Sequence, residues 1–228
     1  MSASAAARQR ALVGLLALSG LFIAALVTCN LIATKFTRLD LGFYVFTVSV
    51  GILPYPLTFL ITDVISEIYG RRRANQVVLS GLLASIMVAG FLALTLPFEA
   101  IEDSVASTRE YAAVFGMGWR VILASMVAYL FAQLIDVRVF HFWKGVTDGK
   151  HLWFRNNAST ILSQLVDTAL VVTVLFVGVW EWGQIAATIR DGWFFKILCA
   201  LLDTPLCYAA VWSYRRWLGL RGAEEASL

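Results

Sequence analysis

The sequence predicts an all-α, polytopic membrane protein with six transmembrane helices and with both termini in the cytoplasm. Of its 228 residues, 60% are hydrophobic and only 14% are charged, and the mean hydropathy is +0.77. Because a soluble domain carries about 25% charged residues, this composition excludes a soluble enzyme. Only 4 prolines and 16 glycines are present, which also excludes a disordered or fibrous chain.

Six apolar runs are long enough to cross a bilayer, which requires about 20 residues. They cover residues 11–34, 41–62, 76–97, 119–137, 158–180 and 193–212. The first run follows Arg8 and Arg10 but is longer than the apolar part of a cleaved signal peptide, so we expect a retained helix. The fourth run is the weakest, because Asp136 interrupts its end. We expect residues 1–228 to form one integral membrane domain.

The basic residues are unevenly distributed between the two sides of this topology. With the N-terminus inside, 12 of the 18 Lys and Arg residues fall on the cytoplasmic side and five on the other, while Lys196 lies in the last helix. Cytoplasmic loops of membrane proteins carry such an excess of positive charge, which supports cytoplasmic termini. The acidic external connection at residues 98–118 is expected to contain a short surface helix.

Several carboxylates and amides lie where lipid should exclude them. Counting inward at 1.5 Å per residue places Asp167 about 14 Å and Asp203 about 15 Å deep. Ionisable residues at such depth line a pathway or pair with each other, and we favour a functional role for both. Gln133 and Asp136 repeat the Q-L-x-D spacing of Gln164 and Asp167, which puts amide and carboxylate on one helix face. For the glutamines, hydrogen bonds that only hold helices together are an equal alternative.

The second apolar run contains a Pro-Tyr-Pro sequence at residues 54–56. We expect it to break or bend the helix, since each proline removes a backbone donor. Broken helices in transporters present free backbone groups to a central site, and a kink repaired by a neighbouring helix is an equal alternative. Asp63 and Glu67 follow as candidate gate residues, and the arginines at 71–73 are expected to anchor the cytoplasmic helix end.

No motif for enzyme, metal or nucleic-acid chemistry is present in the sequence. It contains no G-x-S-x-G, no H-E-x-x-H and no phosphate-binding loop, so we expect neither catalysis nor a cofactor. His141 and His151 have no cysteine nearby, and the three cysteines lie in apolar runs without a CxxC spacing. We therefore expect no metal site and no disulfide framework, and the basic residues follow membrane sidedness rather than a nucleic-acid footprint.

Four sequence blocks together resemble the queuosine precursor transporter family, also called the vitamin uptake transporter family. The first is GILPYPLTFLITDVISEIYG at residues 51–70, and the second is QLIDV at 133–137, followed by Phe140. The third is LWFRNNAST at 152–160, which leads to SQ at 163–164 and DT at 167–168, and the last is DTP at 203–205. The similarity spans about residues 20 to 213, and the length of the first block makes it specific.

The resemblance implies a bacterial inner-membrane importer of queuosine precursors, which are 7-deazaguanine bases that carry a cyano or an aminomethyl group and feed tRNA modification. We expect alternating access around a midplane site, where Tyr55 or Phe59 stacks on the base. The predicted substrate-binding residues are Tyr55, Phe59, Gln133, Gln164, Asp167 and Asp203. The predicted gate or coupling residues are Asp63, Glu67, Asp136, Arg155 and Asn156.

The expected partners are the 7-deazaguanine substrate and the lipid bilayer, without nucleic acid, and a homodimer is compatible with the sequence. Proton-coupled transport and facilitated diffusion with metabolic trapping are equally compatible with it. Two other functions stay open at this point. One is a substrate-binding membrane subunit of a larger energy-coupling complex, which needs partner ATPases. The other is a non-transporting membrane assembly protein whose polar residues only hold helices together.

Overall fold

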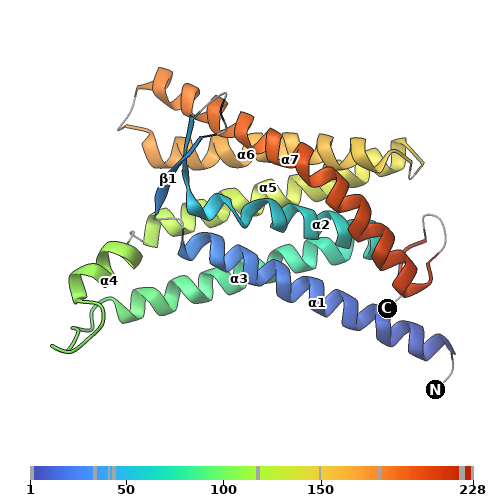
Figure 1. Cartoon of the computed structure of the whole chain (residues 1–228), viewed down its shortest axis with the longest axis horizontal. Coiled ribbons are helices and arrows are strands. Elements are labelled where there is room, and N and C mark those ends of the chain that lie inside the picture. The colour runs from blue at the N-terminus through green and yellow to red at the C-terminus, as the bar shows by residue number, and fades with distance from the viewer. Residues whose placement is uncertain are drawn as a thin grey trace.

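The computed structural model describes residues 3–32, 35–40, 42, 45–116, 119–148, 150–178, 181–220 and 224–226. In this part of the chain, six helices are long and apolar enough to cross a membrane, which confirms the predicted all-α membrane class. The α helices are α1 (Ala3–Leu31), α2 (Tyr55–Tyr69), α3 (Arg71–Thr95), α4 (Thr108–Phe115), α5 (Trp119–Val146), α6 (Leu152–Phe176) and α7 (Trp182–Leu218). Figure 1 shows an elongated bundle with α4 and a β hairpin at one end and both marked chain ends at the other.

The long helices extend beyond the predicted spans, mainly into segments that carry charged side chains. α5 continues past residue 137 to Val146, and α6 begins at Leu152 rather than at residue 158. α7 occupies 37 residues and begins well before the predicted start at residue 193. A span predicted from hydropathy ends at the first charged residues. Several of these charged side chains form ion pairs inside the protein, so the helix itself continues past them.

The predicted second span is wrong at residues 45–49, which form one strand of a β hairpin instead of a helix. Strands β1 (Phe36–Asp40) and β2 (Val45–Ser49) pair antiparallel, with Asp40 opposite Val45. Gly42 has a φ of 80° and donates its N–H to the Asp40 carboxylate at 2.8 Å, which closes the turn. β2 ends in Phe-Thr-Val-Ser, and such alternation of apolar and polar residues is typical of a strand. The long apolar run led to the prediction of a membrane helix, although residues 46–49 alternate between apolar and polar.

The Pro-Tyr-Pro sequence begins α2 rather than breaking a helix, which corrects the expectation of a broken span. Pro54 is the N-cap residue and Pro56 lies in the first turn. A missing N–H costs little there, because the first N–H groups of a helix have no helical acceptor. A short 3-10 helix, η1 (Val50–Ile52), joins the hairpin to α2. α2 then extends to Tyr69, so both predicted gate carboxylates of this segment lie inside the helix.

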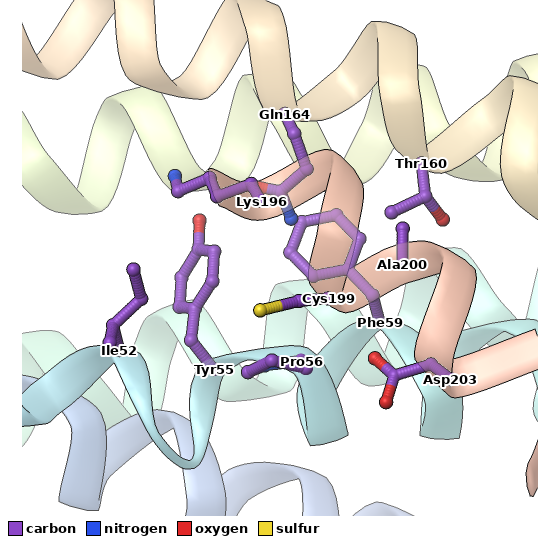
Figure 2. A pocket seen from close by; sticks show the side chains of 10 residues that line it. All are labelled: Ile52, Tyr55, Pro56, Phe59, Thr160, Gln164, Lys196, Cys199, Ala200 and Asp203. Atoms are coloured by element: carbon purple, nitrogen blue, oxygen red, sulfur yellow. The ribbon is translucent and has the colours of Figure 1, made fainter. Parts of the chain in front are cut away.

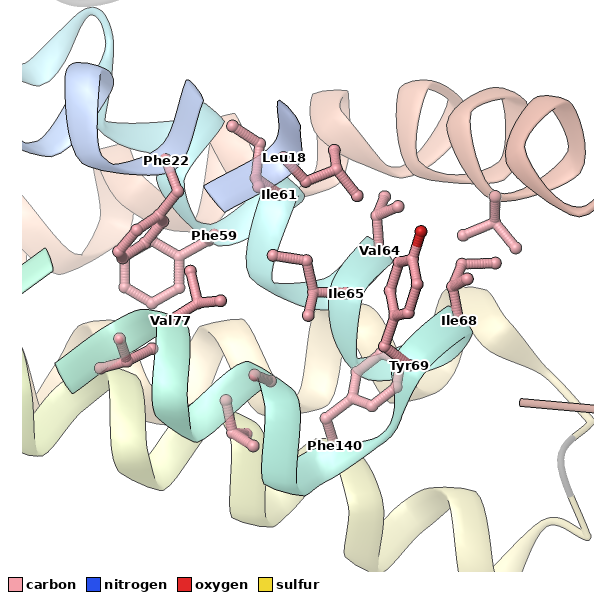
Figure 3. Close-up of a cluster of buried hydrophobic side chains, with 14 of the residues drawn as sticks. Leu18, Phe22, Phe59, Ile61, Val64, Ile65, Ile68, Tyr69, Val77 and Phe140 are labelled. Atoms are coloured by element: carbon pink, nitrogen blue, oxygen red, sulfur yellow. The ribbon is translucent and has the colours of Figure 1, made fainter. Parts of the chain in front are cut away.

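The core lies along α2, whose apolar side chains meet α1, α3 and α5 (Figure 3). Ile65 of α2 is completely buried, and so is Phe22 of α1. Phe22 packs over Gly81 of α3, where an added Cβ would lie 2.5 Å from its ring. The Tyr69 hydroxyl donates to the Ala11 carbonyl oxygen at 3.0 Å, which ties α1 to the end of α2. Close helix approach at a small residue is how membrane helices gain packing energy without a hydrophobic driving force.

The short helix α4 confirms the predicted surface helix in the acidic connection. The Ser107 hydroxyl accepts a hydrogen bond from the Glu110 N–H at 3.2 Å, and the Ser107 N–H donates to the Glu110 carboxylate at 2.8 Å. These hydrogen bonds to the ionised form hold the pKa of Glu110 below its usual value. This reciprocal capping box explains how a helix of 8 residues begins on an exposed connection.

Replacing Gly81 by alanine should destabilise the protein by about 1–3 kcal/mol, because the added methyl group overlaps the Phe22 ring. The matched control is Gly90→Ala on the same helix, where nothing lies within 4 Å of an added Cβ. Thermal unfolding of the purified variants in detergent measures both effects. Equal melting temperatures for the two variants would contradict the close approach of α1 and α3 at Gly81.

Candidate functional site

A polar pocket lies between α2, α6 and α7. Its cavity measures about 10 Å³, room for about one water molecule, so the pocket is nearly closed in this structure. The pocket is lined by Ile52, Tyr55, Pro56, Phe59, Thr160, Gln164, Lys196, Cys199, Ala200 and Asp203. Figure 2 shows the Tyr55 and Phe59 rings between Lys196 on one side and Asp203 on the other. Four of the six predicted substrate-binding residues therefore line one pocket.

Two acceptor groups in this pocket have no partner in the part of the chain that the structure describes. Gln164 is only 3% exposed, yet its side-chain oxygen accepts no hydrogen bond there. Asp203 forms no ion pair within the same residues. The Tyr55 and Phe59 rings stand beside them, with ring centres 5.4 Å apart. Because buried polar groups are normally paired, unpaired acceptors beside aromatic rings suit the N–H donors of a flat ligand.

Lys196 is the site residue that sequence analysis did not single out. Its ammonium nitrogen lies 2.6 Å from the Asp167 carboxylate and 4.7 Å from the centre of the Tyr55 ring. Only 15% of the Lys196 side chain and 6% of the Asp167 side chain are exposed. Asp167 thus faces a lysine and does not line the pocket, although Gln164, one turn earlier, does. The available signal was that Lys196 is the one basic residue in the last apolar run.

Gln133, Asp136 and Asp63 lie outside the pocket lining, where α2, α5 and α6 pack together. Gln133 is completely buried and accepts a hydrogen bond from the Thr62 hydroxyl at 3.3 Å. Asp136 accepts one from the Ser163 hydroxyl at 3.0 Å, and the Asp63 and Asp136 carboxyl groups contact each other. The structure therefore places Gln133 in helix packing and brings the two aspartates of the predicted gate together.

Glu67 is the centre of an ion-pair cluster that joins four helices. Its carboxylate on α2 lies 2.9 Å from Arg155 of α6, 3.0 Å from Arg215 of α7 and 3.8 Å from Lys144 of α5. Arg155 is only 1% exposed, and its guanidinium lies 5.3 Å from the centre of the Phe140 ring. Sequence analysis did not place Arg215 and Lys144 in this group, because spacing along the chain does not reveal which helix ends meet at Glu67. A predicted gate pair, Glu67 with Arg155, is thus one part of a larger cluster.

Two other observations bear on the choice of site. Asn156 lies in α6, but its side chain is outside the described residues, so its role stays a prediction. A larger hollow of about 830 Å³ lies between α1, α3 and α4. Lys35 is the only charged residue in its lining, and none of the predicted site residues belongs to it. The smaller, polar pocket is therefore the candidate binding site.

Six apolar helices, a small internal pocket and a buried ion-pair cluster define a multi-pass membrane protein. The chain belongs to the family described as "Putative vitamin uptake transporter", which matches residues 49–210. This match confirms the resemblance drawn from the sequence blocks. The family is one of transporters rather than of enzymes.

Proteins with related sequences carry a more specific name. The chain is 30% identical to the "Probable queuosine precursor transporter" of Bacillus subtilis (strain 168), over 84% of this chain and 83% of the relative. It is 25% identical to the protein of the same name from Haemophilus influenzae, over 55% of this chain and 51% of the relative. It is 22% identical to the "Queuosine precursor transporter" of Escherichia coli (strain K12), over 58% of this chain and 55% of the relative. No solved structure matches the chain.

Replacing Arg155 by methionine should destabilise the protein by about 3 kcal/mol, because it removes the shortest ion pair of a buried carboxylate. The matched control is Arg190→Met, since Arg190 is 70% exposed and pairs only with its neighbour Asp191 in the described part of the chain. That variant should stay within about 1 kcal/mol of the wild type. Thermal unfolding in detergent provides the measurement. An Arg155 variant as stable as the control contradicts the assignment of Arg155 to a buried ion pair with Glu67.

Proposed function

We propose that this chain imports queuosine precursors, 7-deazaguanine bases with a cyano or an aminomethyl group, across the bacterial inner membrane by alternating access. The names of the relatives support this class of substrate. The observation that carries the proposal is the buried, unpaired side-chain oxygen of Gln164 in a pocket with aromatic walls. Leaving such an acceptor unpaired costs about 1–3 kcal/mol, which a ligand with a matching donor recovers.

A guanine-like base has the chemistry that this pocket complements. Its edge carries two adjacent N–H donors, which the Asp203 carboxylate accepts together, and Gln164 accepts a further N–H. The flat faces of the base stack on Tyr55 or Phe59. Lys196, at the other side of the pocket, donates to the base oxygen. Each end of the ligand thus meets a group of the opposite hydrogen-bonding type.

Asp167 has a positioning role in this proposal rather than direct contact with the base. Its carboxylate holds the Lys196 ammonium at 2.6 Å, and the ammonium also lies over the Tyr55 ring. A lysine without such a counter-ion is expensive to keep at membrane depth. The pair therefore keeps a charged donor beside the pocket.

α2 connects the pocket to the proposed cytoplasmic gate. Phe59, Asp63 and Glu67 follow one another at four-residue steps and therefore lie along one face of the helix. Phe59 lines the pocket, Glu67 holds the ion-pair cluster, and Asp63 lies one turn from each. Alternating access requires the helices that meet at Glu67 to separate when the substrate leaves toward the cytoplasm.

Expression of this chain in a bacterial strain that cannot make queuosine precursors should restore queuosine in tRNA when a 7-deazaguanine precursor is supplied. Gln164→Ala should lower initial uptake of labelled base about tenfold, the effect of one lost hydrogen bond. Gln184→Ala is the matched control, because Gln184 is exposed near the start of α7. A well-expressed wild type that restores no queuosine contradicts the import function and favours a subunit of an energy-coupling complex or an assembly protein.

Asp203→Asn should reduce uptake of the aminomethyl base more than uptake of the cyano base. Lys196 is paired with Asp167, so Asp203 leaves the pocket lining with one negative charge that no described residue balances. The aminomethyl group is cationic at neutral pH and gains from that charge, whereas the cyano group is neutral. We expect a differential effect of about tenfold, typical of a hydrogen bond to a charged group. Competition of each base against the other in uptake measures it, and equal loss for both bases contradicts this charge effect, because both bases share the N–H donors that Asp203 accepts.

A further inference from the structure

The last residues that the structure describes, 224–226, lie across the end of α2. The Ala226 N–H donates to the Ile68 carbonyl oxygen at 2.7 Å, so it pairs one of the carbonyl groups that a helix leaves open at its C-terminal end. The Glu225 side chain lies directly against Gly70, where an added Cβ would overlap the carboxylate. A backbone hydrogen bond and a close side-chain contact therefore hold this segment on α2.

The segment shares its partners with the Glu67 cluster. Lys144 lies 3.3 Å from the Glu225 carboxylate and 3.8 Å from that of Glu67. Arg215 donates to the Glu224 carbonyl oxygen at 3.3 Å and to the Glu67 carboxylate at 3.0 Å. With the buried arginine of α6, three cations lie within 4 Å of the Glu67 carboxylate. Glu225 supplies a second negative charge at this end of the bundle.

We propose that residues 224–226 form a strap that holds the cytoplasmic end of the bundle closed and detaches each time that end opens. The inference rests on the proposed function, since a transporter needs an opening there. The strap contacts α2, α5 and α7, three of the four helices that meet at Glu67, so these helices cannot separate freely while it is bound. The Glu225 side chain is 50% exposed, and an ion pair at such exposure is weak enough to break and re-form.

Native cysteines distinguish a strap from a segment that only completes the end of α2. Cys207 of α7 is 1% exposed and lies two turns before Arg215, whereas Cys29, 5% exposed, lies near the far end of α1. Release of a strap increases access to Cys207 and leaves Cys29 unchanged. Loss of a purely structural cap lowers the melting temperature without a selective change in access.

The test measures alkylation of each cysteine by a membrane-impermeant maleimide in inside-out vesicles, with peptide mass spectrometry as the readout. Glu225→Gln should raise the labelling rate of Cys207 roughly two- to fivefold, the range expected for loss of a partly exposed ion pair. Asp148→Asn is the matched control: it removes a carboxylate at the same end, at a φ of 49° that asparagine adopts readily.

Equal Cys207 labelling in Glu225→Gln and in the wild type would overturn the strap, whatever uptake shows. A parallel rise at Cys29, or in Asp148→Asn, overturns it as well, since either result reports general loosening or a general charge effect. Labelling needs no substrate. Failure of the import assay with a selective rise at Cys207 would therefore count against the proposed substrate, and normal import with unchanged labelling counts against the strap alone.

Discussion

The Glu67 carboxylate and its three cationic partners form the interaction on which the arrangement of the bundle depends. A charge at membrane depth is costly without a partner, so Arg155, 1% exposed, requires the carboxylate at 2.9 Å. Arg215 and Lys144 come from two further helices, and all four helices must meet where Glu67 is. α2 thereby becomes the central helix, and the same face that carries Glu67 presents Phe59 to the pocket.

Pairing also determines which polar groups are left for a ligand. Lys196 is bound to Asp167, and the cations near Glu67 are bound to carboxylates. Gln164 and Asp203 keep acceptor groups without a partner in the described part of the chain, although both lie on membrane helices. Depth alone does not separate the two groups, because Asp167 is as deep in the sequence as Asp203. The difference is that Asp167 has a lysine within hydrogen-bonding distance, whereas Asp203 lines the pocket.

The sequence predicts the class and most of the spans, because lipid allows few charges in a helix that it surrounds. It predicts a helix at residues 45–49, which form a strand, since a hairpin strand and a membrane helix are both apolar and only the two-residue period separates them. Gln164 and Asp203 could be identified from depth and residue type. The pairing of Lys196 with Asp167 could not, because spacing along one helix does not reveal which neighbouring helix faces it.

Contacts of two different physical kinds lie near the pocket. Phe46 of the hairpin packs on Phe195 of α7 with ring centres 4.8 Å apart, directly before Lys196 in the sequence. The second kind is the set of ion pairs around Glu67 and Glu225, two turns beyond Phe59 along α2 and at its end. Separated ions regain hydration in water, whereas separated rings lose contact area and gain nothing from water. Under alternating access, ionic strength therefore weakens the closure at Glu225, where the pair is partly exposed, and leaves the aromatic closure unchanged.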